Sequence, residues 1–351
     1  MKRLTLFFAF ILLATASLLA QAPQPNPKNL NWTPIGQGGV RADPDLFLQG
    51  NFVEIGIAPG GSCGSYAAIP GGYHAFYSRL GFVADFQLDG WAVGTPPQSG
   101  DYFMPGYPWE GWLLQFTFQG SDYNFVNCDA TGDYGIAQTS LTNTSAGANN
   151  SAVWIGTAFG GGQSIEVTQN FHFTDNDAKF MIDVTLKNVG SQPVENVEYA
   201  RVVDPDQEVD LGGDFTTSNF VKHQPESGNN LAMAVGNGLN WGIPCGLLMY
   251  HSTAKASVNP STLDYRNPND ILDFTNAPTE GAPYIADVGL GVACRIPVLN
   301  PGQSVTIPVA YVLNENEIIN PPARTPVSNW AIAIMVGLIV VFTIVRFRRM
   351  N

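Results

Sequence analysis

Charged side chains are scarce in this 351-residue chain, at 13% of all residues, and basic side chains are the scarcest, with 16 Lys and Arg against 29 Asp and Glu. Five of the basic residues lie in the two chain ends, whereas every acidic residue lies between Asp43 and Glu317, so the remainder carries 11 − 29 = −18 charges. This charge excludes nucleic acid as a partner and argues against docking on anionic lipid. The same negative charge is compatible with the binding of divalent cations.

The chain also lacks the spacings that bring catalytic or metal-binding side chains together. Its four cysteines form no C-x-x-C pair, and its histidines have no helical i, i+4 partner. Zinc-dependent catalysis is therefore not indicated. The histidines are His74, His172, His223 and His251. We expect a protein that is not an enzyme.

Sustained helical periodicity is absent from residues 35–318, and turn formers are abundant instead, with 37 Gly and 25 Pro in the chain. Apolar and polar residues alternate in Ser164–Thr174 and in Lys179–Asn188, on either side of a polar turn. This alternation predicts an antiparallel hairpin with one buried face. The predicted inward residues are Ile165, Val167, Phe171, Phe173, Phe180, Ile182, Val184 and Leu186. A third strand is predicted at Val194–Val203.

Shorter apolar runs between turns predict further strands. They are Phe52–Ala58, Trp112–Phe118, Tyr123–Cys128, Leu231–Val235, Gly246–His251, Asp287–Pro297 and Ser304–Leu313. The segment Gly94–Trp109 holds four prolines and is expected to be a loop packed by its own aromatic residues. Residues 35–318 are thus predicted to be all-β, forming a large antiparallel β-sandwich of the supersandwich kind. The third strand and its turn weakly resemble repeat units of bacterial surface β-sandwiches.

The N-terminus has the pattern of a secretory signal. Lys2-Arg3 precede ten mostly apolar residues, Leu4–Leu13, and a zone suited to cleavage follows. We expect residues 1–20 to be a signal peptide, with an uncleaved anchor as the alternative. The prolines of residues 21–34 predict an extended lead-in.

The C-terminal end predicts one membrane span. From Trp330 to Val345 every residue is apolar, Gly or Thr. As a helix, this stretch covers roughly 24 Å, which its flanks extend toward the ~30 Å of a bilayer core. The basic residues that would stop transfer on the cytoplasmic side are Arg346, Arg348 and Arg349. We expect residues 319–326 to be a spacer and residues 327–351 to be a transmembrane segment, with the bulk of the chain outside the cytoplasm.

The same tail resembles the sorting signals of bacterial surface proteins that exosortase-like transpeptidases process, the PEP-CTERM and IPTL-CTERM class. Pro326, Ser328 and Trp330 stand in the order of the IPTL kind. However, Pro326 and Ser328 are one residue closer together here, and Thr325 replaces the usual Ile. The resemblance implies a bacterial envelope location, an exosortase-like partner and cleavage near Pro326. An ordinary single-span anchor is the alternative.

Deleting Val327–Asn351 is expected to leave the exported domain folded and to move it from the membrane fraction into the soluble fraction, because the apolar tail is the predicted anchor. Fractionation followed by immunoblotting measures this. A truncated protein that still pellets with membranes would contradict the anchor. Intact-mass measurement of surface material separates the two forms of the prediction: a C-terminus near Val327 indicates sorting, and one at Asn351 indicates a plain anchor.

Four cysteines are an even number in a chain expected to be exported, which makes disulfides one expectation. Nearness in sequence favours Cys63–Cys128 together with Cys245–Cys294, and buried free thiols are the alternative. No Cys precedes Cys63, so a lipoprotein signal is excluded.

The densest acidic cluster directly follows the third predicted strand. Its members are Asp204, Asp206, Glu208, Asp210 and Asp214. Alternating carboxylates beside Gly212-Gly213 offer hard oxygen ligands in a flexible loop, which suits Ca²⁺. The spacing is not that of an EF-hand, since Val209 stands where that loop needs Gly. A solvated acidic loop is the alternative to a Ca²⁺ site.

Two targeting ends and no catalytic signature predict a non-enzymatic cell-surface or extracellular-matrix protein with an adhesive role and a surface glycan or matrix partner. The alternative is a carbohydrate-binding module, or a relative of carbohydrate-active enzymes on a supersandwich fold. Indole faces stack on sugar rings, and paired carboxylates cleave glycosides. The candidates are Trp91, Trp109, Trp112, Trp154 and Trp241 for stacking, and Glu54, Glu110 and Glu166 for chemistry.

Overall fold

A computed structural model describes residues 45–316 except 66, 77–78, 106–109, 129–132, 227–228, 259–266 and 274–279. The predicted signal peptide, the proline-rich lead-in, the spacer and the sorting segment with its arginines all lie outside these residues. Within the described part, no helix has the length and apolar character needed to cross a membrane.

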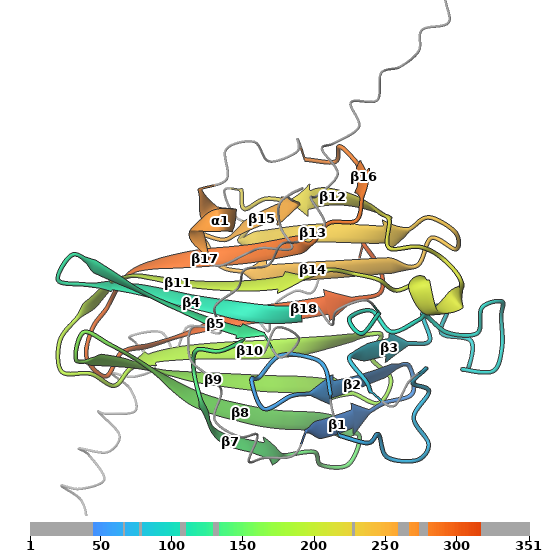
Figure 1. Cartoon of the computed structure of the whole chain (residues 1–351), viewed down its shortest axis with the longest axis horizontal. Coiled ribbons are helices and arrows are strands. Elements are labelled where there is room, and N and C mark those ends of the chain that lie inside the picture. Colours follow the sequence, from blue (N-terminus) through green and yellow to red (C-terminus); the bar gives the residue numbers. More distant parts are fainter. Residues whose placement is uncertain are drawn as a thin grey trace, which may run out of the picture.

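The described elements are almost entirely strands, in three antiparallel sheets (Figure 1). The small sheet consists of β1 (Leu46–Gln49), β2 (Val53–Ile57) and β3 (Phe82–Ala84). The nine-stranded sheet has, in order, β16 (Tyr284–Ala286), β12 (Thr217–His223), β13 (Leu231–Gly238), β14 (Pro244–Tyr250), β18 (Ser304–Val312), β10 (Lys179–Asn188), β9 (Gln163–Thr174), β8 (Asn149–Gly160) and β7 (Gln138–Asn143). The six-stranded sheet has β15 (Lys255–Val258), β17 (Leu290–Leu299), β11 (Val194–Val203), β4 (Glu110–Phe118), β5 (Ser121–Cys128) and β6 (Asp133–Tyr134). The short helices are η2 (Val209–Leu211) and α1 (Asn269–Leu272).

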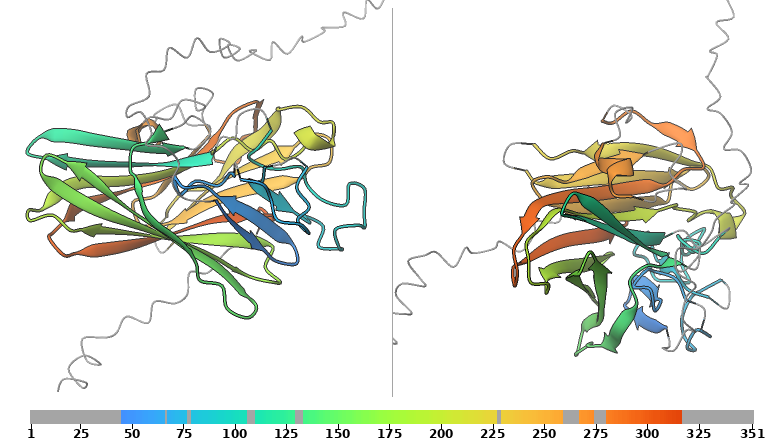
Figure 2. Two further views of the ribbon diagram at one scale, coloured as in Figure 1. Left: turned by 60° about the horizontal axis from the view of Figure 1, so that its bottom comes forward. Right: turned by 60° about the vertical axis from the view of Figure 1, so that its left-hand side comes forward.

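The two large sheets form two layers around one core, which confirms the all-β prediction (Figure 2). Trp112 of β4 packs edge-on against Trp154 of β8, with ring centroids 5.3 Å apart. The small sheet joins the same core, because Phe82 of β3 contacts Phe180 of β10 edge-on at 5.1 Å. The outer face of the six-stranded sheet carries a smaller apolar cluster, which Ile271 of α1 helps to cover.

The predicted hairpin is β9 and β10, and all eight residues predicted to point inward are buried. The register places Ile182 opposite Phe171 and Val184 opposite Gln169. Gln163 and Gln169 are the polar residues among the inward positions of β9, and Gln169 is fully buried.

The strand after the hairpin, β11, leaves the nine-stranded sheet and pairs with β4 and β17 in the opposite layer. Its pairing with β4 is irregular between Glu195 and Glu198, where Asn196 has a positive φ of 45°. Because β11 lies in the six-stranded sheet, the acidic segment that follows it begins at the end of a strand of that layer.

The described part of the predicted proline-rich loop contains no strand, and Tyr102 and Phe103 are fully buried. Their rings pack less on each other than on the sheets: Tyr102 stacks on Phe82 at 4.4 Å, and Phe103 lies 5.1 Å from Tyr311. The loop is therefore packed by the core of the domain rather than by its own aromatic residues alone.

Of the two alternatives for the cysteines, the structure has the buried thiols and not the disulfides: Cys63, Cys128, Cys245 and Cys294 are all buried, and none is in a disulfide bond. Cys245 lies on β14 and Cys294 on β17, in opposite sheets. Burial raises the pKa of the thiols of Cys245 and Cys294, and burial followed by Glu110 raises that of Cys63. The thiolate form needed for exchange is thus disfavoured, and sequence proximity was a poor guide to pairing.

Candidate functional site

The structure divides the predicted acidic cluster into separate parts. Glu208 is buried, and its carboxylate accepts hydrogen bonds from the backbone N–H groups of Asn240 (2.7 Å), Trp241 (3.0 Å) and Ile243 (3.0 Å). It thereby holds the turn between β13 and β14. A Cβ atom on Gly238 would lie 1.9 Å from Cδ of Glu208, so this carboxylate requires glycine there.

Two more of the predicted ligands also have other roles. Oδ2 of Asp210 accepts a hydrogen bond from the backbone N–H of Asp101 at 2.9 Å. Asp214 is exposed, and its Oδ1 accepts from the backbone N–H of Thr216 at 2.7 Å. The five carboxylates therefore do not form one coordination shell.

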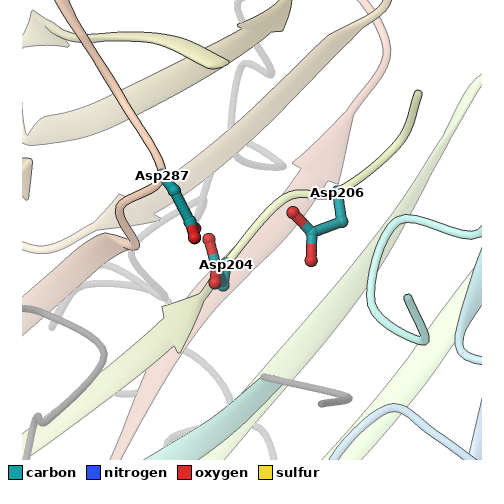
Figure 3. Close-up of side chains that lie close together, drawn as sticks. All are labelled: Asp204, Asp206 and Asp287. Carbon is teal, nitrogen blue, oxygen red and sulfur yellow. The ribbon is translucent and has the colours of Figure 1, made fainter. Parts of the chain in front are cut away.

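Asp204 and Asp206 do come together, and they are joined by Asp287, which sequence reasoning did not select (Figure 3). One carboxylate oxygen of each residue lies within 4.8 Å of those of the other two. Asp204 and Asp206 follow β11, whereas Asp287 lies between β16 and β17. The signal in the sequence was weak, because Asp287 is an isolated carboxylate far along the chain.

Asp204 and Asp206 are buried, and Asp287 is partly buried. Asp204 is 8% exposed and Asp206 is 4% exposed. Burial, followed by the charges of Asp204, Asp287 and Asp210, raises the pKa of Asp206 well above its usual range. Like charges this close in a low-dielectric site oppose one another unless a proton or a cation offsets them.

The segment that carries Asp206 is tied firmly into the fold. The backbone N–H of Asp206 donates to the carbonyl of Tyr102 at 2.9 Å. Nε2 of the buried Gln207 donates to the carbonyls of Gly236 (3.0 Å) and Ile243 (2.7 Å). Residues 204–208 therefore hold both the acidic cluster and the β13–β14 turn.

The β13–β14 turn forms one wall of a cleft of about 350 Å³, which we call the end cleft. The opposite walls come from the loop after β3, the residue before β10 and the chain after β18. It is lined by Phe86, Gln87, Leu88, Ala178, Asn237, Gly242, Pro244, Leu313, Asn314 and Glu315. Side-chain amides and one carboxylate thus face a partly apolar wall.

The candidate catalytic carboxylates are held by different partners. Glu54 binds Nδ1 of His74 at 2.7 Å, and Glu110 forms a fully buried ion pair with Arg201. Glu166 lies on the partly exposed face of β9, opposite Lys187 in the register. Since Glu110 is 1% exposed and neutralised by a guanidinium, it is not accessible to a substrate.

Arg201 is the centre of a buried polar network that the sequence analysis missed. Its guanidinium binds Glu110 and Oε1 of Gln169, the latter at 2.5 Å, while the hydroxyl of Tyr311 donates to Glu110 at 2.8 Å. The backbone N–H of Cys63 donates to the other carboxylate oxygen at 2.5 Å. The sequence held one signal for this network: Gln169 and Arg201 are polar residues at strand positions that point into the core.

The segment Gly60–Gly64 fits the pattern Gly-x-Ser-x-Gly, which was wrongly taken to be absent when no catalytic signature was found in the sequence. The structure gives it a structural role. Ser62 is fully buried, and the segment follows β2 as a turn, without the strand-to-helix geometry of a nucleophile elbow. The indole N–H groups of Trp112 and Trp154 donate to the carbonyls of Gly60 and Pro59.

These contacts also account for two of the tryptophans proposed to stack on sugars, since Trp112 and Trp154 are core residues. Trp109 lies outside the described residues. Trp91 is partly buried and stacks on His74 with ring centroids 4.0 Å apart. Trp241 is 39% exposed on the β13–β14 turn and directly precedes Gly242, which lines the end cleft.

No family model and no curated protein matches this chain. Among solved structures, a galactose mutarotase related enzyme from Lactobacillus acidophilus matches with a TM-score of 0.37 and 7% identity, covering 77% of this chain and 97% of its own. A galactose mutarotase-like protein from Lactobacillus casei matches with a TM-score of 0.35 and 9% identity, covering 77% and 100%. The Slr1438 protein from Synechocystis sp. matches with a TM-score of 0.36 and 10% identity, covering 79% and 98%. Scores this low identify no family.

Proposed function

We propose that the protein is an exported, envelope-held β-sandwich that binds a neutral carbohydrate in the end cleft. The observation that carries this proposal is the composition of the cleft: amide and carboxylate side chains beside an apolar wall, around about 350 Å³. That volume lies in the range of small-molecule sites, which combine apolar walls with a few placed polar groups. The predicted targeting ends supply the location outside the cytoplasm.

The polar groups suit the hydroxyl groups of a sugar. The side-chain amides of Gln87, Asn237 and Asn314 each offer both a donor and an acceptor. Phe86, Leu88 and Pro244 supply apolar surface for the C–H faces of a sugar ring. Trp241, which precedes the lining residue Gly242 on the same turn, is 39% exposed.

The charges favour a neutral ligand and binding rather than hydrolysis. None of the described residues that line the end cleft is Lys or Arg, so no group there would neutralise a phosphate or sulfate. Glu315 is the single carboxylate, and it already pairs with Nζ of Lys222 at 3.3 Å. Glycoside cleavage generally uses two carboxylates flanking the bond.

Leu88 adds an independent indication. Its φ is +58°, which is uncommon for a bulky residue, and its side chain is 47% exposed in the cleft wall. Strained backbone persists where the surroundings hold it, and it is enriched at ligand sites. With this backbone conformation, the apolar side chain of Leu88 is exposed to solvent next to Gln87 in the sequence.

The full-length chain, in a detergent without a sugar head group, is expected to bind neutral glycans on an array. For the best glycan, Gln87→Ala should weaken binding by roughly three- to tenfold, because one hydrogen-bonding side chain is worth about 0.5–1.5 kcal/mol. Gln87 is exposed, so its truncation should leave the melting temperature unchanged. Titration calorimetry measures the affinity.

Gln192→Ala is the matched control, since Gln192 is an exposed glutamine in the turn after β10, whereas the end cleft lies beside the residue before β10. It should bind as the parent does. Absence of glycan binding by the parent chain, or equal affinities for the two variants, would overturn the proposal.

A further inference from the structure

Asp204, Asp206 and Asp287 are not among the residues that line the end cleft, and what they bind does not depend on that proposal. We propose that Asp204, Asp206 and Asp287 bind a divalent cation, and that the ion is Ca²⁺. Their ligand oxygens already lie within 4.8 Å of one another, a separation that one shared ion would span.

Asp206 provides the observation that distinguishes this group from an ordinary acidic cluster. Its side chain is 4% exposed, and its Oδ1 is buried without a hydrogen-bond partner. Figure 3 shows the carboxylate of Asp206 directed toward Asp204 and Asp287. A buried carboxylate with an unsatisfied oxygen is costly, whereas coordination of a cation supplies the missing partner.

The donor atoms select the type of ion. All three side chains offer hard carboxylate oxygens, and the group contains no thiolate or imidazole, so soft transition metals are disfavoured. Mg²⁺ binds with several of its waters retained, which suits an open site better than this buried one. Ca²⁺ accepts carboxylates in one- or two-oxygen modes with flexible geometry.

The position in the fold gives such an ion a structural role. Asp204 follows β11 of the six-stranded sheet, and Asp287 directly follows β16 of the nine-stranded sheet. A cation bound to both would link the two layers where β17 begins. Net charge at the site would change from −3 to −1, which removes most of the mutual repulsion.

Calorimetric titration of the chelator-treated full-length chain with CaCl₂ is expected to show one ion bound per chain. The melting temperature should rise by about 5–10 °C when free Ca²⁺ is ~100-fold above Kd. MgCl₂ at equal concentration should give a smaller shift. Asp206→Asn should abolish both the binding and the Ca²⁺-dependent shift, and Asp287→Asn should do the same.

Asp214→Asn is the matched control, because Asp214 belongs to the same acidic segment but is exposed and occupied with Thr216. It should keep the full Ca²⁺ response. If the parent chain binds no Ca²⁺, a proton shared between the carboxylates accounts for the cluster and the proposal fails. It also fails if Asp214→Asn loses the response while Asp206→Asn keeps it.

Discussion

Replacing Arg201 with methionine is expected to lower the free energy of unfolding by about 3–5 kcal/mol. Arg201 is fully buried, and it provides the positive charge opposite Glu110, which is also buried. The substitution keeps much of the side-chain volume but leaves an uncompensated carboxylate inside the sandwich. Oε1 of Gln169 would lose its 2.5 Å donor as well. Urea denaturation followed by tryptophan fluorescence measures the change.

Arg295→Met is the control for this prediction. Arg295 also lies on a strand and also pairs with a glutamate, Glu198 at 2.5 Å, but its side chain is 39% exposed. Glu198 itself is 1% exposed, but water can reach its carboxylate once the exposed guanidinium is removed, so the loss should be smaller than for Arg201, at about 1–2 kcal/mol. Equal losses for the two arginines would contradict the special role of burial.

The double variant Glu110→Gln/Arg201→Met tests the cause. It removes both buried charges, and buried ion pairs are often replaceable at little net cost when both members are removed together. We expect it to be more stable than Arg201→Met alone. If the double variant is less stable than Arg201→Met, the loss of stability comes from altered packing and not from the unpaired charge of Glu110.

Replacing Glu208 with alanine is expected to destabilise the domain by about 3 kcal/mol, because three backbone N–H groups lose a charged acceptor. These belong to Asn240, Trp241 and Ile243, in the turn that walls the end cleft. The loss of stability should be greatest in the β13–β14 turn, so hydrogen exchange at these three amides should accelerate more than at other amides. Glycan affinity should fall together with it, since Gly242 and Pro244 line the cleft.

Glu195→Ala is the matched control, since Glu195 is exposed on β11. Its effect should stay within roughly 0.5 kcal/mol, as for most surface substitutions. Unchanged protection of the 240–243 amides in Glu208→Ala would show that the turn is held by other contacts, such as the two hydrogen bonds from Gln207.

Strands were predictable wherever large apolar residues alternate, as in β9 and β10. Strand β8 was not predicted, and it shows where alternation of large apolar residues is not a sufficient signal. Its inward positions include Ala152, Gly156 and Ala158, beside the buried Trp154. A Cβ atom on Gly156 would lie 2.4 Å from the ring of Trp154 and 2.8 Å from the carbonyl of Ala137, so the large ring requires small neighbours. Small residues contribute little to an alternating hydrophobic pattern, so the pattern did not predict this strand.

By itself, the sequence determined the all-β class, the β9–β10 hairpin with its inner face, and the acidic character of the segment after β11. These depend on local alternation and composition, which the order of residues fixes. Only the tertiary structure decided that β11 joins the opposite sheet, that Glu110 meets Arg201 across 91 positions, and that Asp287 joins Asp204 and Asp206. Alternation shows that a side chain points inward but not which strand lies opposite, because pairing between distant strands is set by the packing of the whole core.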